Sequence, residues 1–225
     1  MTKEEYFKDW LKVIDENILL NVVNQINSLY KIKKCEPSYH DIFKAFHITP
    51  YDDLSIVFLL QDPYPQIGVS TGIALGNKID KKELSPSLQV VKEAVIDFEV
   101  PHNILNFDPT LEEWSKQGVL LLNSALTVEA NKPNSHAFIW RPFIKSLLIN
   151  LSELNPGLIY VLWGNEAKTF KKYINSNMNI IYTMPHPAYY ARNNMKLPHK
   201  FFIELNNIIY SKYNKRINWY KEKYL

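Results

Sequence analysis

Four short apolar runs constrain the fold of this chain more than any other feature of its sequence. They cover residues 56–60, 118–123, 158–163 and 179–183, and turn-forming or polar residues bound them. Apolar runs of this length are typical of buried strands. Because segments with helical spacing separate the runs, we expect βαβ units and an α/β fold. The predicted architecture is a central four-stranded, mainly parallel, twisted sheet with helices on both faces, an α/β/α sandwich.

The helices are predicted from apolar side chains at helical spacing and from capping residues. Pro86 fits the first turn of a helix that Ser85 caps, and Ser135 or Asn134 is expected to cap a long helix further on. The predicted helices cover residues 2–30, 39–46, 86–98, a short stretch near 112, 135–151, 164–174 and 199–213. No repeat, linker or low-complexity tract is present, so we expect a single domain over residues 1–225, with residues 1–38 as a helical region packed on it.

Composition limits the class of protein and its location. The chain has 225 residues, of which 46% are hydrophobic and 22% charged, and no apolar run approaches the roughly 20 residues of a membrane span. The N-terminus lacks the apolar core of a signal peptide. The single cysteine, Cys35, excludes an intramolecular disulfide framework and suits a reducing compartment. We therefore expect a cytoplasmic, monomeric protein that is not bound to a membrane.

The net charge and the positions of the glycines limit the classes of ligand that the chain is expected to bind. A net charge of +3 permits binding to a polyanion without requiring it. The six glycines form neither GxGxxG nor GxxxxGK[ST], so the usual nucleotide-phosphate loops are missing. No cysteine-rich metal site is possible with one cysteine. We expect neither a metal nor a cofactor.

Polar or turn-forming groups follow each of the four predicted strands. They are Asp62, Asn123, the pair Gly164-Asn165, and His186. Ligands of open α/β sheets bind outside the carboxyl ends of the strands, which lie on one edge when the strands are parallel. The sequence therefore predicts a pocket that holds a carboxylate, a carboxamide and an imidazole.

Each of these residues also fits an ordinary structural role. Asp62 suits a general base or an anion that stabilises positive charge, but Asp is common in turns. Asn123 offers an acceptor and two donors, which suit the carbonyl and ring N–H of a pyrimidine, but it could equally satisfy backbone groups. His186 lies between two prolines that stiffen its backbone, yet a lone histidine is more often structural than catalytic.

At these residues the chain resembles the family 1 uracil-DNA glycosylases. Six family motifs occur in the family's order within a resemblance that runs from about Tyr39 to Trp219. GQDPYH corresponds to LQDPYP at 60–65, GLAF to GIAL at 72–75, PPSL to SPSL at 85–88, LLLNxxLTV to LLLNSALTV at 120–128, LLWG to VLWG at 161–164, and HPSPLS to HPAYYA at 186–191.

The resemblance implies an enzyme that flips uracil out of single- or double-stranded DNA and hydrolyses its N-glycosidic bond in base-excision repair. It assigns the stabilisation of the sugar cation and the orientation of water to Asp62, and a hydrogen bond to the uracil anion to His186. Asn123 would hydrogen-bond to uracil O4 and N3–H, and Tyr64 would exclude the methyl group of thymine. The remaining residues that it implies are Gln61 and Leu75 at the base, and Ser87, Gly164, Asn165, Ala188, Tyr190 and Arg192 at the DNA. A protein inhibitor that mimics DNA is a further partner it allows.

The chain departs from the family at several of these positions. Leu75 replaces the phenylalanine that stacks on uracil, and Tyr190, preceded by Tyr189, replaces the leucine that intercalates. Asn165 and Ala188 each replace a serine. Two alternatives therefore remain open: a glycosylase with an altered base preference, and a catalytically weak DNA-binding or assembly module with the same fold.

Overall fold

Four parallel strands form the central sheet in a computed structural model, which describes residues 3–80, 83–96 and 105–222. The strands are β2 (Ile56–Leu60), β4 (Val119–Asn123), β6 (Ile159–Trp163) and β7 (Ile180–Met184). Their order is β4-β2-β6-β7, and each neighbouring pair is parallel. All residues of β2, β4 and β6 are buried, as expected for strands covered on both faces. The predicted fold class is confirmed.

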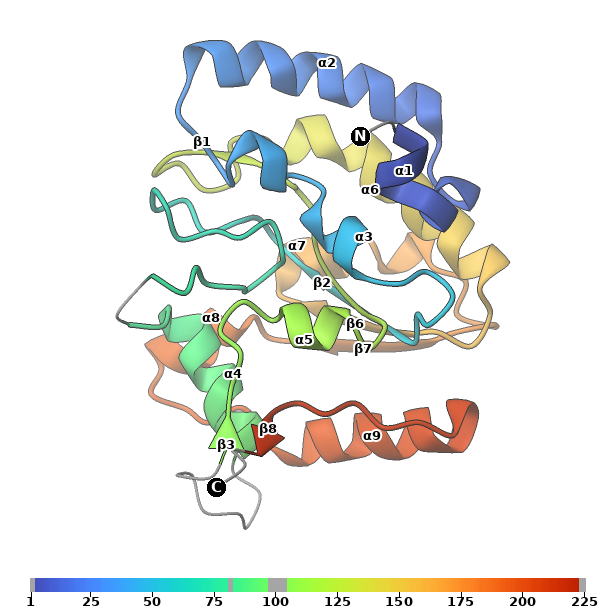
Figure 1. Ribbon diagram of the computed structural model, residues 1–225. Coiled ribbons are helices and arrows are strands. Elements are labelled where there is room, and N and C mark those ends of the chain that lie inside the picture. The colour runs from blue at the N-terminus through green and yellow to red at the C-terminus, as the bar shows by residue number, and fades with distance from the viewer. Residues whose placement is uncertain (1–2, 81–82, 97–104, 223–225) are drawn as a thin grey trace.

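Helices cover both faces of the sheet (Figure 1). Alternate side chains of each strand point to opposite faces, so Val57 and Leu59 enter one core while Phe58 and Leu60 enter the other. The first core contains residues of α1 (Lys3–Phe7), α2 (Glu16–Ile32), α3 (Lys44–Ile48), α6 (Ala137–Leu154) and α7 (Asn165–Lys168). The second contains residues of α4 (Pro86–Ile96), α5 (Glu112–Ser115), α8 (Pro187–Arg192) and α9 (Lys200–Tyr213).

The N-terminal region is not the single helix that we predicted over residues 2–30. It consists of α1, a 3-10 turn η1 (Lys8–Lys12) and α2, and Thr2 lies outside the described residues. The break has a local cause, because Asp15 caps α2 by accepting hydrogen bonds from the backbone N–H groups of Asn17 and Ile18, both at 3.0 Å. Apolar spacing continues across the break because both halves pack on the same core.

Other predicted helix limits also differ from the structure. The segment 39–46 divides into η2 (Tyr39–Asp41) and α3, and the segment 164–174 divides into α7 and η4 (Lys171–Tyr173). Helix α4 is described through Ile96, so the expected end at residue 98 lies outside the described residues. Neither Ser135 nor Asn134 caps α6: the helix follows His136, and the Ser135 hydroxyl accepts from the Glu129 N–H at 2.7 Å instead.

One helix and four short strands were absent from the prediction. Helix α8 begins directly after His186, where we predicted no helix. Two small antiparallel pairs join β1 (Cys35–Glu36) to β5 (Val128–Glu129) and β3 (Leu105–Asn106) to β8 (Lys221–Glu222). Strands of two residues are too short to show a period of two in the sequence.

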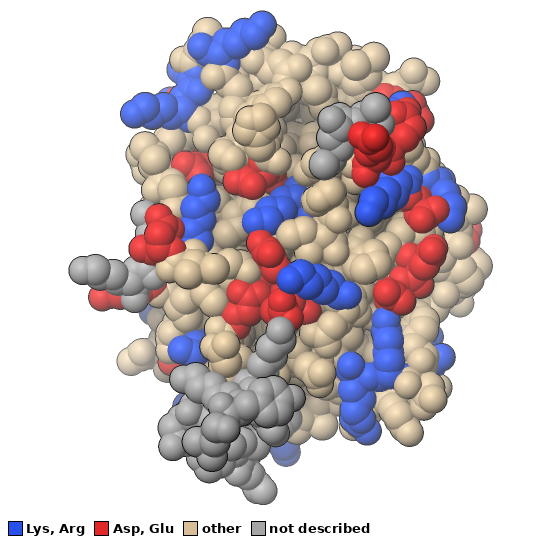
Figure 2. Space-filling model, viewed as in Figure 1, with Lys and Arg blue, Asp and Glu red and all other residues tan. Residues whose placement is uncertain are grey.

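The surface is of mixed charge on the face shown in Figure 2, where acidic and basic side chains are interspersed. Within the described part of the chain, no helix is long and apolar enough to cross a membrane.

Candidate active site

A cavity of about 290 Å³ opens at the carboxyl ends of β2 and β4. This is close to the roughly 300 Å³ at which small-molecule pockets begin, so it suits one small ring system. The predicted convergence is present, since Asp62, Asn123 and His186 all line it. The complete lining is Leu60, Gln61, Asp62, Pro63, Tyr64, Pro65, Ser70, Ile73, Leu75, Ser87, Asn123, Pro133, His186, Ala188 and Arg192.

Strand pairing places the carboxamide of Asn123 in the cavity. Asn123 is the last residue of β4 and lies opposite Leu60 of β2. Beyond the strands, the Ser124 N–H donates to the Leu60 carbonyl at 2.9 Å and the Ser124 hydroxyl to the Gln61 carbonyl at 2.8 Å. Within the described residues the Asn123 carboxamide has no hydrogen-bond partner, although the residue is only 7% exposed. A buried amide in this state is available to a ligand with complementary groups.

The carboxylate of Asp62 is fixed by two donors. One oxygen accepts from the backbone N–H of Asn134 at 2.6 Å, and the other accepts from the Gln61 side-chain amide at 3.1 Å. Burial raises the pKa of Asp62, while both hydrogen bonds favour the ionised form and oppose this rise. The result is a carboxylate that is held in one orientation at the cavity wall.

A buried hydrogen-bond network holds the segment that carries Asn134. The Trp140 indole N–H donates to the Thr127 hydroxyl at 2.7 Å, and this hydroxyl lies 2.9 Å from Nδ1 of His136. The Thr127 oxygen therefore joins the indole of Trp140 to the imidazole of His136. Burial lowers the pKa of His136, which favours the neutral ring. Sequence reasoning missed this network, and it missed Asn134 as a partner of Asp62.

His186 is oriented by the helix that it caps. The Ala188 N–H donates to His186 Nδ1 at 3.1 Å, so the proton of the neutral ring sits on Nε2. Burial, with a further contribution from the Arg192 charge, lowers the pKa of His186 to about 4. The imidazole is therefore neutral near pH 7 and presents Nε2–H as a donor.

Gly164 permits the close approach of β6 to this histidine. Its φ is +95°, a conformation that disfavours side chains, and an added Cβ would lie 3.1 Å from His186 Cβ. Gly164 does not line the cavity itself, and neither does the exposed Asn165 that begins α7. Gly164 lies against the side chain of His186.

Two hydrogen bonds hold the phenol oxygen of Tyr64. It accepts from the Ser85 hydroxyl at 2.5 Å and donates to the Leu75 carbonyl at 3.1 Å. Burial raises the pKa of Tyr64, so the group stays protonated and able to donate at any physiological pH. Leu75 is 5% exposed and has a φ of +65° within a turn closed by the Gly76 N–H and the Ile73 carbonyl.

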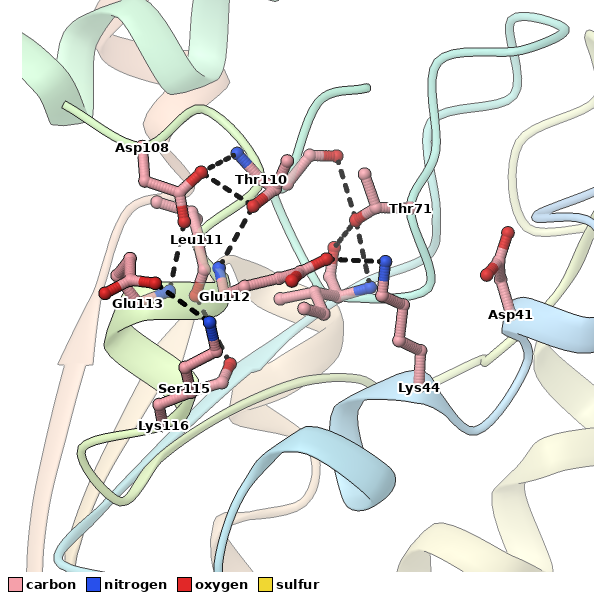
Figure 3. Close-up of polar contacts among 12 residues, drawn as sticks. Asp41, Lys44, Thr71, Asp108, Thr110, Leu111, Glu112, Glu113, Ser115 and Lys116 are labelled. Carbon is pink, nitrogen blue, oxygen red and sulfur yellow. Dashed lines mark hydrogen bonds and ion pairs between the residues drawn. The ribbon is translucent and has the colours of Figure 1, made fainter. Parts of the chain in front are cut away.

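The loop that carries Leu75 packs on a capped turn before α5, and Figure 3 shows the polar contacts of that turn. Asp108 accepts from the Thr110 N–H at 2.9 Å, from the Thr110 hydroxyl at 2.6 Å and from the Glu113 N–H at 3.0 Å. Lys44 of α3 forms an ion pair with Glu112 at 2.7 Å. Gly76 approaches this turn so closely that an added Cβ would lie 2.5 Å from the Thr110 carbonyl oxygen. The backbone around Leu75 is therefore rigidly supported.

The structure places some of the candidate DNA-contacting residues at the cavity and others away from it. Ser87, Ala188 and Arg192 line the cavity. Tyr190 does not reach the surface, because it is 8% exposed and packs in the second core, whereas the adjacent Tyr189 is 45% exposed. The described residues contain no cluster of three or more histidine, cysteine, aspartate or glutamate side chains that could hold a metal ion.

Comparison with known proteins relates this geometry to one family. The model of the Uracil DNA glycosylase superfamily matches residues 46–209. A protein named Uracil-DNA glycosylase from Campylobacter lari is 38% identical over 224 residues, which are 96% of this chain and 94% of the relative. Another of that name from Fusobacterium nucleatum is 34% identical over 218 residues, 94% of each chain.

Solved structures share the fold. Mimivirus UNG Y322F in complex with UGI superimposes with a TM-score of 0.81 at 22% identity, over 97% of this chain and 89% of that one. The wild-type UNG from Nitratifractor salsuginis gives a TM-score of 0.61 at 19% identity, over 91% of this chain and 97% of that one. At these identities the likeness establishes the fold alone.

Proposed function

The chain belongs to the uracil DNA glycosylase superfamily, and on this basis we propose that it is a monofunctional uracil-DNA glycosylase of base-excision repair. It flips uracil out of DNA and hydrolyses the N-glycosidic bond, which leaves an abasic site. The observation that carries the proposal is the convergence of Asp62, Asn123 and His186 on one cavity of a size that suits a single base. A base must leave the duplex before it can enter such a cavity.

Asn123 and Tyr64 recognise uracil. The free carboxamide donates to uracil O4 and accepts from N3–H. Cytosine presents an amino group and an unprotonated ring nitrogen at these two places, so the same amide orientation is mismatched. The Tyr64 ring lies beside C5 and excludes the methyl group of thymine by steric clash.

Asp62 and His186 carry out the cleavage of the bond. As the C1′–N1 bond breaks, its electron pair goes to the base, so positive charge develops on the sugar and negative charge on uracil O2. Asp62 stabilises the sugar cation and orients the water that adds to C1′. His186 donates its Nε2–H to O2, helped by backbone N–H groups near Gln61. No step requires a metal or a cofactor.

Binding of DNA uses small residues and one cation around the cavity mouth. Ser87, Ala188 and the Gly164-Asn165 turn let phosphates approach the backbone closely, and Arg192 supplies a positive charge. An aromatic wedge fills the space that the flipped base leaves. We assign the wedge to Tyr189 in place of Tyr190, because only Tyr189 exposes its ring.

We also propose a monomer in the cytoplasm, in keeping with a substrate that is cellular DNA. Two of the mimivirus UNG structures with this fold are complexes with UGI. The same DNA-binding face would accept a protein inhibitor that mimics DNA.

Oligonucleotides with one uracil, thymine or cytosine at a defined position test the proposal. We expect release of uracil alone, detected as alkali-sensitive strand cleavage at the abasic site. Binding of the uracil oligonucleotide without release of any base would overturn it in favour of a non-catalytic DNA-binding module.

A second candidate function is excision of a bulkier or modified uracil. Leu75 favours it, because a leucine leaves different space above the base than a stacking ring does. Faster release of a 5-substituted uracil than of uracil itself would support this second candidate.

A further inference from the structure

A chain of three hydrogen bonds connects the first turn of α4 to the wall of the cavity. The Leu88 N–H points to the Ser85 hydroxyl at 3.4 Å, this hydroxyl donates to the Tyr64 hydroxyl at 2.5 Å, and Tyr64 donates to the Leu75 carbonyl at 3.1 Å. Each hydroxyl accepts one bond and donates the next. Hydrogen bonds in such a series polarise and strengthen one another.

Two hydrogen bonds hold the backbone of Ser85. Its N–H donates to the side chain of Asn77 at 2.9 Å, and its carbonyl accepts from the Gln89 N–H at 2.9 Å as α4 begins. Asn77 is only 1% exposed, so this anchor is part of the core. The backbone that carries the Ser85 side chain is therefore anchored at both its N–H and its carbonyl.

The serine is a departure from the family motif. SPSL at residues 85–88 stands where the resembling glycosylases have PPSL, so Ser85 occupies a proline position. A proline has neither a hydroxyl to donate to Tyr64 nor an N–H to donate to Asn77. The connection between α4 and the tyrosine is thus a property of this chain's own residues.

Exclusion of a methyl group requires that the side chain in its way keep its position in the cavity wall. An apolar pocket that can adjust distinguishes substrates differing by one methyl group by only about 10- to 200-fold. The Tyr64 ring is attached to the backbone at one end and could turn away from a substituent at C5. The two hydrogen bonds at its oxygen hold the other end of the ring and oppose this movement.

We propose that Ser85 is a positioning residue for base selection, which holds Tyr64 in place so that 5-substituted uracils are rejected. This inference rests on the proposed glycosylase function. It also connects base selection to DNA binding, because Ser87, the candidate phosphate contact, lies in the first turn of α4, which follows Ser85.

Single-turnover release of uracil and of thymine from matched oligonucleotides tests the role of Ser85. We expect Ser85→Ala to slow uracil release by less than about threefold and to raise the ratio of thymine to uracil release at least about tenfold. Ser85→Thr keeps the hydroxyl and should keep the wild-type ratio. A general loss of stability would slow both reactions equally and leave the ratio unchanged.

Tyr64→Phe removes both hydrogen bonds at the oxygen of the ring, one of which Ser85→Ala also removes, without changing the start of α4. It should raise the ratio at least as much as Ser85→Ala does, and the double variant should raise it no further than Tyr64→Phe alone. An unchanged ratio in Tyr64→Phe, or additive effects in the double variant, would overturn the inference even if Ser85→Ala fails to fold. Absence of uracil release by the wild type would instead overturn the proposed function.

Discussion

Changing the pH between 5 and 8 tests whether His186 acts as a neutral donor. With its pKa lowered to about 4, the imidazole is protonated in roughly one molecule in a thousand at pH 7. With an ordinary pKa near 6.5, the protonated fraction would be about three-quarters at pH 6 and about 3% at pH 8. A mechanism that needs the imidazolium would therefore slow about 25-fold over these two units.

The assay is single-turnover uracil release at saturating enzyme, followed from pH 5 to pH 8. We expect no fall in rate between pH 6 and 8, and a loss only at the acidic end, where Asp62 takes up a proton. The pKa of Asp62 is raised by burial, so this loss begins above the usual range of an aspartate. His186→Gln is the matched control, because glutamine is a donor that does not titrate.

The refuting result is a rate that falls about 25-fold from pH 6 to pH 8 in the wild type and is level in His186→Gln. Such a profile would mean that the charged ring donates the proton. It would contradict both the lowered pKa of His186 and the role of its Nδ1 as the acceptor of the Ala188 N–H.

Unfolding in urea provides an independent measurement of the same pKa. Because the folded-state pKa lies below that of the unfolded chain, the unfolded state binds the proton first as the pH falls. The contribution of His186 to stability is therefore complete above pH 6.5 and is lost between pH 6.5 and 4. A shift of this size corresponds to about 3 kcal/mol, which His186→Gln should remove from the pH dependence.

Three further substitutions have expected outcomes. Asn123→Asp should admit cytosine, because a protonated carboxyl can donate to the ring nitrogen while its other oxygen accepts from the amino group; release of cytosine from an oligonucleotide measures this. Leu75→Phe should tighten binding of uracil-containing DNA about fivefold or more, as expected from at least 1 kcal/mol of stacking, in a fluorescence titration. Thr127→Val leaves the buried His136 and Trp140 nitrogens without a partner and should lower the free energy of unfolding by about 2–4 kcal/mol, while Thr127→Ser should retain most of it.

The sheet and the centre of the cavity could be predicted because their signals are local. Strands buried on both faces are continuous apolar runs, and β2, β4 and β6 are fully buried. Once the strands are parallel, their carboxyl ends must meet at one edge. The placement of Asp62, Asn123 and His186 follows from that geometry alone.

The supports of the cavity could not be predicted because they leave no pattern in the sequence. A backbone N–H such as that of Asn134 is present at nearly every position, so its bond to Asp62 depends on tertiary structure. The six residues of α8 are too few to show helical periodicity, and its orientation decides that Tyr190 is buried while Tyr189 is exposed. Ser85 was expected only as a helix cap, since its partner Tyr64 lies 21 residues away.

The most direct test of the proposed function is uracil release by the wild type and by Asp62→Asn under single-turnover conditions. Asparagine keeps the size of the side chain and removes the charge that stabilises the sugar cation. We predict that the variant binds the uracil oligonucleotide as tightly as the wild type does and releases uracil at least about 100-fold more slowly. Uracil release at the wild-type rate by Asp62→Asn would contradict the assignment of this cavity as the catalytic site.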